Sequence, residues 1–255
     1  GIVAGLQFDA ADGQAVIDVA MPLSGRAGIL SLARPLPAFD PPAFVPEDSP
    51  IVNTIAINWA GVLPLARDIV TTLPDDQRAQ MEAQLTAFSL AAAPILQSLG
   101  NELVTYSRVN RPFAPDSEAS LTAIAVANEA VISAAITQYG QMMGLQAREF
   151  LGSQIFEAPE QLGAPFALGL GRGWAFVGDP VEIENALRRL SNEGADTLGD
   201  QRLFADAIKP LEPQAIAYAY TDLVAYFEFS QWIATHVEEY VRGTISGDWV
   251  DEETI

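Results

Sequence analysis

Histidine, lysine and cysteine, three residue types that often perform catalysis, are almost absent from this chain. His236 is the sole histidine, Lys209 is the sole lysine, and cysteine is absent. Without cysteine there is no thiolate nucleophile, disulfide, zinc–thiolate site or iron–sulfur cluster. A metallopeptidase helix would need a second histidine one turn from His236, and no Gly-x-Ser-x-Gly elbow supports a serine triad. We therefore predict that His236 lies on a helix surface with a structural role.

Other motifs that suggest chemistry are better explained by folding. The run from Gly169 to Gly173 is similar to a phosphate loop, but Trp174 replaces the third glycine of a dinucleotide fingerprint and a strand follows, which indicates a hairpin turn. Lys209 ends a predicted helix, where a cation is favourable. Paired acids such as Asp75-Asp76 diverge by about 100° on a helix, so they do not share a site. We predict no catalytic, cofactor-binding or metal-binding residues, and hence no cofactor.

The aromatic residues near the carboxyl end are the best candidates for a binding surface. Leu223, Tyr226, Phe227 and Ile233 recur at helical spacing, so we expect them to pack in the core. If the same helix exposes its other aromatics, they can form a groove for a protein or a ligand. The predicted partner or ligand surface consists of Phe229, Trp232, His236, Tyr240 and Trp249.

Charge restricts the possible partners. The 255 residues include 33 acidic side chains and 13 lysines plus arginines, which gives a formal charge of −20. Such a surface repels nucleic-acid phosphates and anionic lipids, and suits basic partners or divalent cations. The longest apolar stretch, Phe88 to Leu99, is interrupted by Pro94 and Gln97 and is shorter than the roughly 18 residues that a spanning helix needs. We predict no nucleic-acid binding and no transmembrane segment.

Turn and periodicity signals divide the first half into recognisable elements. Alternation on both sides of Asp12-Gly13 predicts a hairpin, and a short helix follows over 27–33. Six prolines between Pro35 and Pro50 indicate an extended connector over the surface. Asn58 is placed to cap the helix that follows the next strand. The elements expected after the connector are strands over 51–57 and 103–109 and helices over 59–73 and from 75 to beyond Pro94.

The second half repeats this alternation of strand and helix. Asp179 is a strong helix N-cap, because Pro180 occupies the first turn and Glu182 can complete a capping box. Asn128 is another candidate cap. The expected strands are 121–126, 150–156, 165–171, 173–177 and 215–220, and the expected helices are 130–143, 180–190, 201–208 and 222 to about 241.

The recurring strand, cap and helix define the predicted fold class. The strand cores Ile55-Ala56-Ile57, Ile124-Ala125-Val126 and Ala217-Tyr218-Ala219 are alike, and hairpins are frequent. We predict an α+β fold of duplicated units, with mostly antiparallel sheet and helices packed on one face. The expected divisions are the end of a preceding unit (1–34), a proline-rich connector (35–50), a first half (51–116), a second half (117–245) and an acidic tail (246–255).

Six segments resemble an uncharacterised family of exported bacterial envelope proteins, which contain a domain of unknown function with repeated α+β units. The likeness covers about two thirds of the chain and is one of pattern rather than of a rare motif. It implies a periplasmic or envelope location, a longer parent protein and no catalytic residues. The segments are Val45–Ser49, Leu99–Glu102, Trp174–Gly178, Val181–Leu190, Thr197–Phe204 and Ala217–Leu223.

Together these observations favour a non-enzymatic extracytoplasmic scaffold or interaction module of a bacterial envelope assembly, with a protein partner or self-assembly. One alternative is a carrier of an apolar or amphiphilic small molecule held between the sheet and the helices. Another is a hydrolase based on carboxylates or serine. The abrupt first and last residues, Gly1 and Ile255, also suggest a piece of a longer protein.

Overall fold

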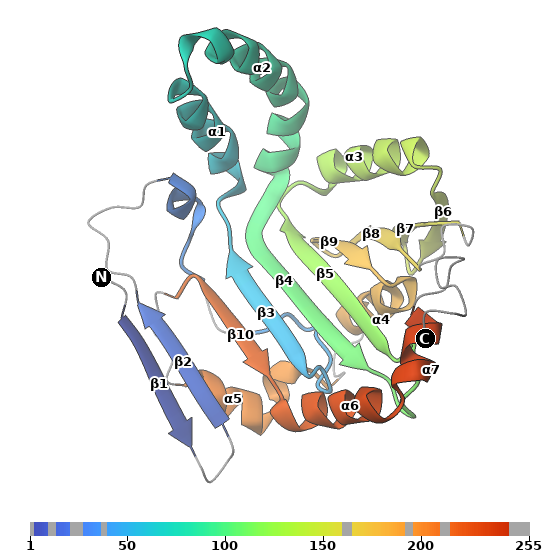
Figure 1. The fold of residues 1–255 in the computed structure, drawn as a ribbon. Coiled ribbons are helices and arrows are strands. Elements are labelled where there is room, and N and C mark those ends of the chain that lie inside the picture. Colours follow the sequence, from blue (N-terminus) through green and yellow to red (C-terminus); the bar gives the residue numbers. More distant parts are fainter. Residues whose placement is uncertain are drawn as a thin grey trace.

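An antiparallel sheet of eight strands forms the centre of the molecule (Figure 1). The computed structural model describes residues 3–9, 14–20, 28–36, 40–159, 165–191, 196–209 and 215–244. The strand order is β10-β3-β4-β5-β9-β8-β7-β6, and every neighbouring pair is antiparallel. The predicted α+β class with antiparallel sheet is confirmed. The strands of this sheet are β3 (Ile51–Ala56), β4 (Leu99–Val109), β5 (Glu118–Val126), β6 (Gln146–Phe150), β7 (Ser153–Glu157), β8 (Ala167–Gly171), β9 (Trp174–Gly178) and β10 (Ala217–Thr221).

A separate hairpin and a set of helices surround the sheet. The hairpin consists of β1 (Val3–Asp9) and β2 (Gln14–Ala20). Figure 1 shows α1 and α2 as a helical hairpin that projects beyond one end of the sheet, whereas α6 runs along the other end. The α-helices are α1 (Val62–Thr71), α2 (Asp75–Ser98), α3 (Glu129–Met142), α4 (Pro180–Ser191), α5 (Arg202–Ile208), α6 (Leu223–Thr235) and α7 (Val237–Thr244), and the short 3-10 helices are η1 (Gly28–Leu32), η2 (Trp59–Gly61) and η4 (Leu198–Asp200).

The main core lies between the sheet and α4. Alternate strand residues point to one face, because side chains in a strand alternate between the two faces. Those of β4, β5 and β9 include Val104, Leu121 and Phe176, which are fully buried. Ile183 and Leu187 of α4 pack against them. Side chains therefore fill the space where the carrier hypothesis places an apolar ligand, and this arrangement gives that hypothesis no support.

The opposite face carries α3 over β6 and β8. The close approach depends on Gly140, because a Cβ built there would lie 2.8 Å from the ring of Phe156. The strands of the two predicted halves are not separate sheets, since β10 pairs with β3 and places Tyr218 opposite Thr54.

The proline-rich connector is irregular, as its prolines predict, but it does not lie over the surface. Phe44 and Val45 are completely buried. The ring of Phe44 meets the rings of Trp174 and Phe176 edge to face, with centroids 4.9 Å and 5.5 Å apart. The prediction of a surface connector was wrong because proline content excludes regular structure without specifying depth, and burial of a large aromatic side chain is strongly favourable.

Local capping predictions are partly confirmed. The Oδ1 atom of Asp179 accepts hydrogen bonds from the backbone N–H groups of Val181 and Glu182, at 2.7 Å and 3.3 Å. Asn128 caps α3 by accepting from the N–H of Val131. Asn58 makes no side-chain cap, so that prediction was wrong. The predicted capping box is absent, because the carboxylate of Glu182 points into the core and accepts hydrogen bonds there from Tyr106 and Arg108.

Two predicted boundaries also change. The single strand expected over 150–156 is a hairpin, since Leu151 and Gly152 both have positive φ and form the turn between β6 and β7. The helix expected from 222 to 241 is interrupted at His236, which separates α6 from α7. The acidic tail 246–255, including Trp249, lies outside the described residues.

Candidate functional site

Four of the five predicted site residues come together in a cluster where α6, α7 and the loop after β4 meet. We call this set the aromatic cluster: Phe113, Phe229, Trp232, His236 and Tyr240. The indole of Trp232 is nearly parallel to the rings of Phe229 and His236, with centroids 6.0 Å and 4.9 Å away. Phe113 contacts Phe229 at 5.5 Å, and Tyr240 meets Phe229 edge to face at 6.4 Å.

The aromatic cluster is only partly exposed. Phe229 is 6% accessible, Trp232 and Tyr240 are half-buried, and His236 is exposed, as the predicted helix-surface position requires. The prediction that Phe229 belongs to a free binding surface was therefore wrong. The aromatic cluster joins α6 to α7 through Tyr240 and to the 110–117 loop through Phe113. Phe113 was not among the residues that the sequence singled out.

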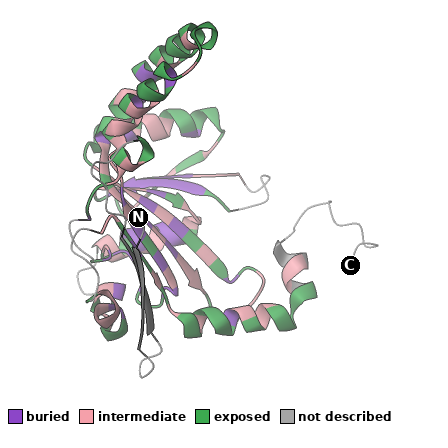
Figure 2. Cartoon of the chain, turned by 60° about the vertical axis from the view of Figure 1, so that its left-hand side comes forward, coloured by how far each residue is buried: buried purple, intermediate pink, exposed green. Residues whose placement is uncertain are grey.

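The opposite side of α6 carries the exposed residues. The sequence predicted core positions for Leu223, Tyr226 and Phe227, but all three are exposed, and Phe227 is 62% accessible. Val224 is also exposed. Ile233, the fourth predicted core residue, is half-buried. The core prediction was thus wrong for three of its four residues, since both sides of α6 carry apolar residues at helical spacing. Figure 2 shows the largely exposed course of α6.

His236 ends α6 and makes no catalytic pairing. Its Nδ1 atom lies 3.0 Å from the carbonyl oxygen of Trp232 and 3.0 Å from the hydroxyl of Thr235. Among the described side chains, no serine or carboxylate hydrogen-bonds with it. Nor does the described part of the chain contain a group of three or more histidines and carboxylates placed to hold a metal ion.

An arginine lies on the outer edge of the aromatic cluster. The guanidinium carbon of Arg111 is 4.6 Å from the ring centroid of Phe113, and the same guanidinium forms an ion pair with Glu228. A cation over an aromatic ring with a carboxylate at its end is a favourable arrangement. It is repeated where Arg188 lies 5.0 Å from the ring of Phe150 and pairs with Glu184.

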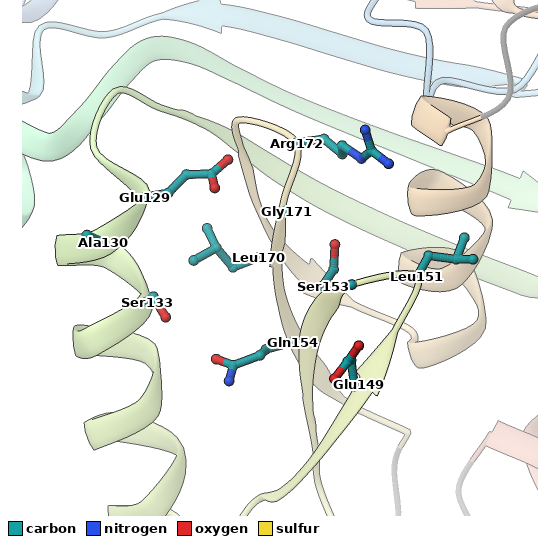
Figure 3. Close-up of a pocket in the computed structure, with 11 residues that line it drawn as sticks. Glu129, Ala130, Ser133, Glu149, Leu151, Ser153, Gln154, Leu170, Gly171 and Arg172 are labelled. Atoms are coloured by element: carbon teal, nitrogen blue, oxygen red, sulfur yellow. The ribbon is translucent and has the colours of Figure 1, made fainter.

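A polar groove of about 660 Å³ lies between α3 and the β6–β9 end of the sheet (Figure 3). Glu129 and Ser133 line it from α3, Gln154 points toward α3 from β7, and Leu170 lies between them. The lining residues include no histidine, cysteine or lysine, but they do include two serines and two glutamates: Ser133, Ser153, Glu129 and Glu149. No hydrogen bond links either serine to either glutamate, so these lining residues form no serine–carboxylate pair in the structure.

The fold already uses two of the residues at this groove. Arg172 and Gly173 both have positive φ and form the two-residue turn between β8 and β9, which confirms the hairpin prediction for this glycine-rich run. The Oε1 atom of Glu129 accepts a hydrogen bond from the N–H of Gly173 at 2.5 Å. Glu129 therefore supports the turn.

The most buried charged group lies in the core, away from either region. The Glu182 carboxylate accepts hydrogen bonds from the Tyr106 hydroxyl and from Arg108, both at 3.1 Å. Burial and the adjacent carboxylate raise the pKa of Tyr106 well above its usual value, so the phenol remains a donor. Arg108 also bonds Asp48 at 2.8 Å. Every charge in this network has a partner, which indicates a structural role.

Comparison of the chain with protein-family models, with curated proteins and with solved structures finds no match. The function must therefore be inferred from the molecule itself. Within the described segments, no helix combines the length and apolar character that crossing a membrane requires, which agrees with the prediction from the sequence.

Proposed function

We propose that this protein is a non-enzymatic interaction module of an extracytoplasmic assembly in a bacterial envelope, and that its partner binds the outer side of α6. The observation that carries the proposal is a surface helix that is apolar on both sides. Its inner side packs through Phe229 and Trp232, while its outer side presents Leu223, Tyr226 and Phe227 to solvent. A helix that is hydrophobic all round is normally buried.

The surroundings of α6 indicate the chemistry of the partner. Large apolar side chains that remain exposed together mark interaction sites in soluble proteins. The chain carries a charge of −20, and the only charged residue within α6 is Glu228, which is already paired with Arg111. A partner with an apolar patch and a basic rim would bury Phe227 and would be attracted by the net negative charge of the chain.

The resemblance of six segments to exported envelope proteins supports the proposed location. The described residues also offer little for the competing hydrolase hypothesis. His236 is bonded within its own helix end, and no hydrogen bond links a serine that lines the polar groove to either of its glutamates.

A pair of charge-matched variants tests the proposal. Phe227→Glu and Gln141→Glu each add one carboxylate to an exposed helical position, and Gln141 belongs to α3 rather than to α6. Partners are captured from an envelope extract, identified, and titrated against both purified variants. Because a central aromatic anchor dominates the binding energy, we expect Phe227→Glu to weaken binding at least tenfold and Gln141→Glu to change it little. A protein that captures no partner, or equal effects of the two variants, would overturn the proposal.

A further inference from the structure

The long helix α2 has a second exposed apolar surface that is independent of α6. Met81, Phe88 and Ile95 recur at intervals of seven residues, and they are 40%, 60% and 36% accessible. Seven residues make nearly two helical turns, so the three side chains lie in one line, about 10.5 Å apart along the axis. We call this line the α2 seam.

The seam lies at the border of the packed side of α2. Ser89 and Ala92 are buried against the rest of the molecule, and Ala92 is one turn from Phe88. Leu90 is 80% accessible, but two residues along a helix turn it about 200° away from Phe88. Figures 1 and 2 show α2 projecting from the sheet with much of its length exposed, so another helix can approach the seam.

The lack of charged residues in the second half of α2 favours contact with another copy of the chain. Two copies of a chain with a charge of −20 repel each other, so a stable contact must avoid acidic surface. No charged residue lies between Glu82 and Glu102. The part of the seam around Phe88 and Ile95 can therefore meet its own copy without burying a charge.

The spacing of the seam also specifies the geometry of pairing. In an antiparallel pair with a twofold axis at Phe88, that residue faces its own copy while Met81 faces Ile95 of the other molecule. All three apolar residues are then used on both sides, as an isologous interface requires. We propose that α2 pairs with α2 of a second copy of this chain, antiparallel, along the α2 seam.

The expected dimer is weak. Three partly exposed side chains per copy, of the order of 100 Å² each, bury roughly 600 Å² in total, which is below the range of tight interfaces. Association should therefore depend on concentration in the micromolar range or above.

Sedimentation of the intact chain tests the pairing. We expect the apparent mass to rise toward that of a dimer with concentration, and Phe88→Glu to abolish the rise because two carboxylates would meet at the axis. Leu90→Glu is the matched control, with the same charge on another side of the same helix, and it should still dimerise. A chain that stays monomeric at all concentrations, or equal effects of the two variants, would overturn the proposal. The seam would then be available only to a different protein.

Cysteine cross-linking tests the register, since the chain has no cysteine of its own. Under mild oxidation, Phe88→Cys should cross-link to itself. Met81→Cys and Ile95→Cys should cross-link when the two variants are mixed and remain largely monomeric when each is alone. Cross-linking of Met81→Cys to itself would indicate a parallel pair and would overturn the antiparallel geometry. Neither assay involves the outer side of α6, so this proposal and the proposed function fail separately.

Discussion

The guanidinium of Arg108 lies 3.1 Å from the carboxylate of Glu182 inside the molecule, although 74 residues separate them in the chain. The Glu182 side chain is only 2% accessible, and that of Arg108 is 19% accessible. The pair links β4 to the first turn of α4. It fixes how the helix sits on the sheet, and it explains why Glu182 does not complete the capping box.

Removing the arginine should destabilise the protein strongly. Arg108→Ala leaves a buried carboxylate without its cation, which costs about 3–5 kcal/mol of the free energy of unfolding. Asp48→Asn removes only the more exposed partner of Arg108 and should cost about 1 kcal/mol or less. Urea denaturation of both variants measures the difference. Equal losses would mean that the buried pair contributes no more than the exposed one.

The two sides of α6 should respond differently to truncation. Phe229→Ala removes a buried ring that contacts Phe113, Trp232 and Tyr240, so we expect a loss of about 3–5 kcal/mol. Phe227→Ala removes an exposed ring and should change the stability of the isolated protein by about 0.5 kcal/mol or less. Thermal unfolding compares them. A large loss for Phe227→Ala alone would contradict the described orientation of the helix.

Ionisation of the Glu102 carboxyl should lower the stability of the protein as the pH rises. Burial, and secondarily the charge of Asp40, raise the pKa of Glu102 above its usual 4.5. The folded state then binds more protons than the unfolded state between 4.5 and the raised pKa, so stability falls as pH rises through that window. Glu102→Gln should therefore stabilise the protein at neutral pH and lose this advantage below pH 4.5. Denaturation at several pH values measures it.

Asp48 provides a comparison of opposite sign. Burial alone would raise its pKa, but the hydrogen bond and charge of Arg108 outweigh burial and hold the pKa below 3.8. Its contribution is present above the usual pKa and is lost as pH falls through the lowered value. Asp48→Asn should thus be less stable than the native protein at neutral pH, with the difference vanishing in acid. The same pH dependence for both variants would contradict these assignments.

A tight contact beside the polar groove gives a packing test. A Cβ on Gly171 would lie 2.1 Å from the Ser153 hydroxyl oxygen and 2.9 Å from its Cβ. Gly171→Ala should cost about 1–3 kcal/mol through overpacking. Adding Ser153→Gly removes the obstructing side chain, so the two changes should be less than additive in a double-mutant cycle. Strict additivity would show that the two side chains do not compete for this space.

The sequence predicted most elements of the fold because the signals for them are local. Alternation located the strands at 51–56 and 174–178, and Asp179 and Asn128 were recognised as caps from their position before apolar periodic runs. A cap is a contact between residues two or three apart, so neighbouring sequence is sufficient to specify it. The turn at Arg172-Gly173 was recognisable for the same reason.

The candidate site was only half predictable. The sequence identified α6 and its aromatics, but periodicity ranks the sides of a helix by hydrophobicity and cannot choose between two apolar sides. Phe113 was missed because it lies in a loop, where no periodic pattern marks a residue that packs.

The sequence by itself determined the α+β composition, the acidic surface, the lack of cysteine chemistry and most of the local turns and caps. Only the tertiary structure decided which side of α6 is buried, that Phe44 packs in the core, and that Glu182 binds Tyr106 and Arg108. These outcomes depend on contacts between residues far apart in the chain, since burial and ion pairing are set by what a side chain meets in space. The same long-range contacts decide which apolar residues of α6 and α2 stay exposed and which pack in the interior.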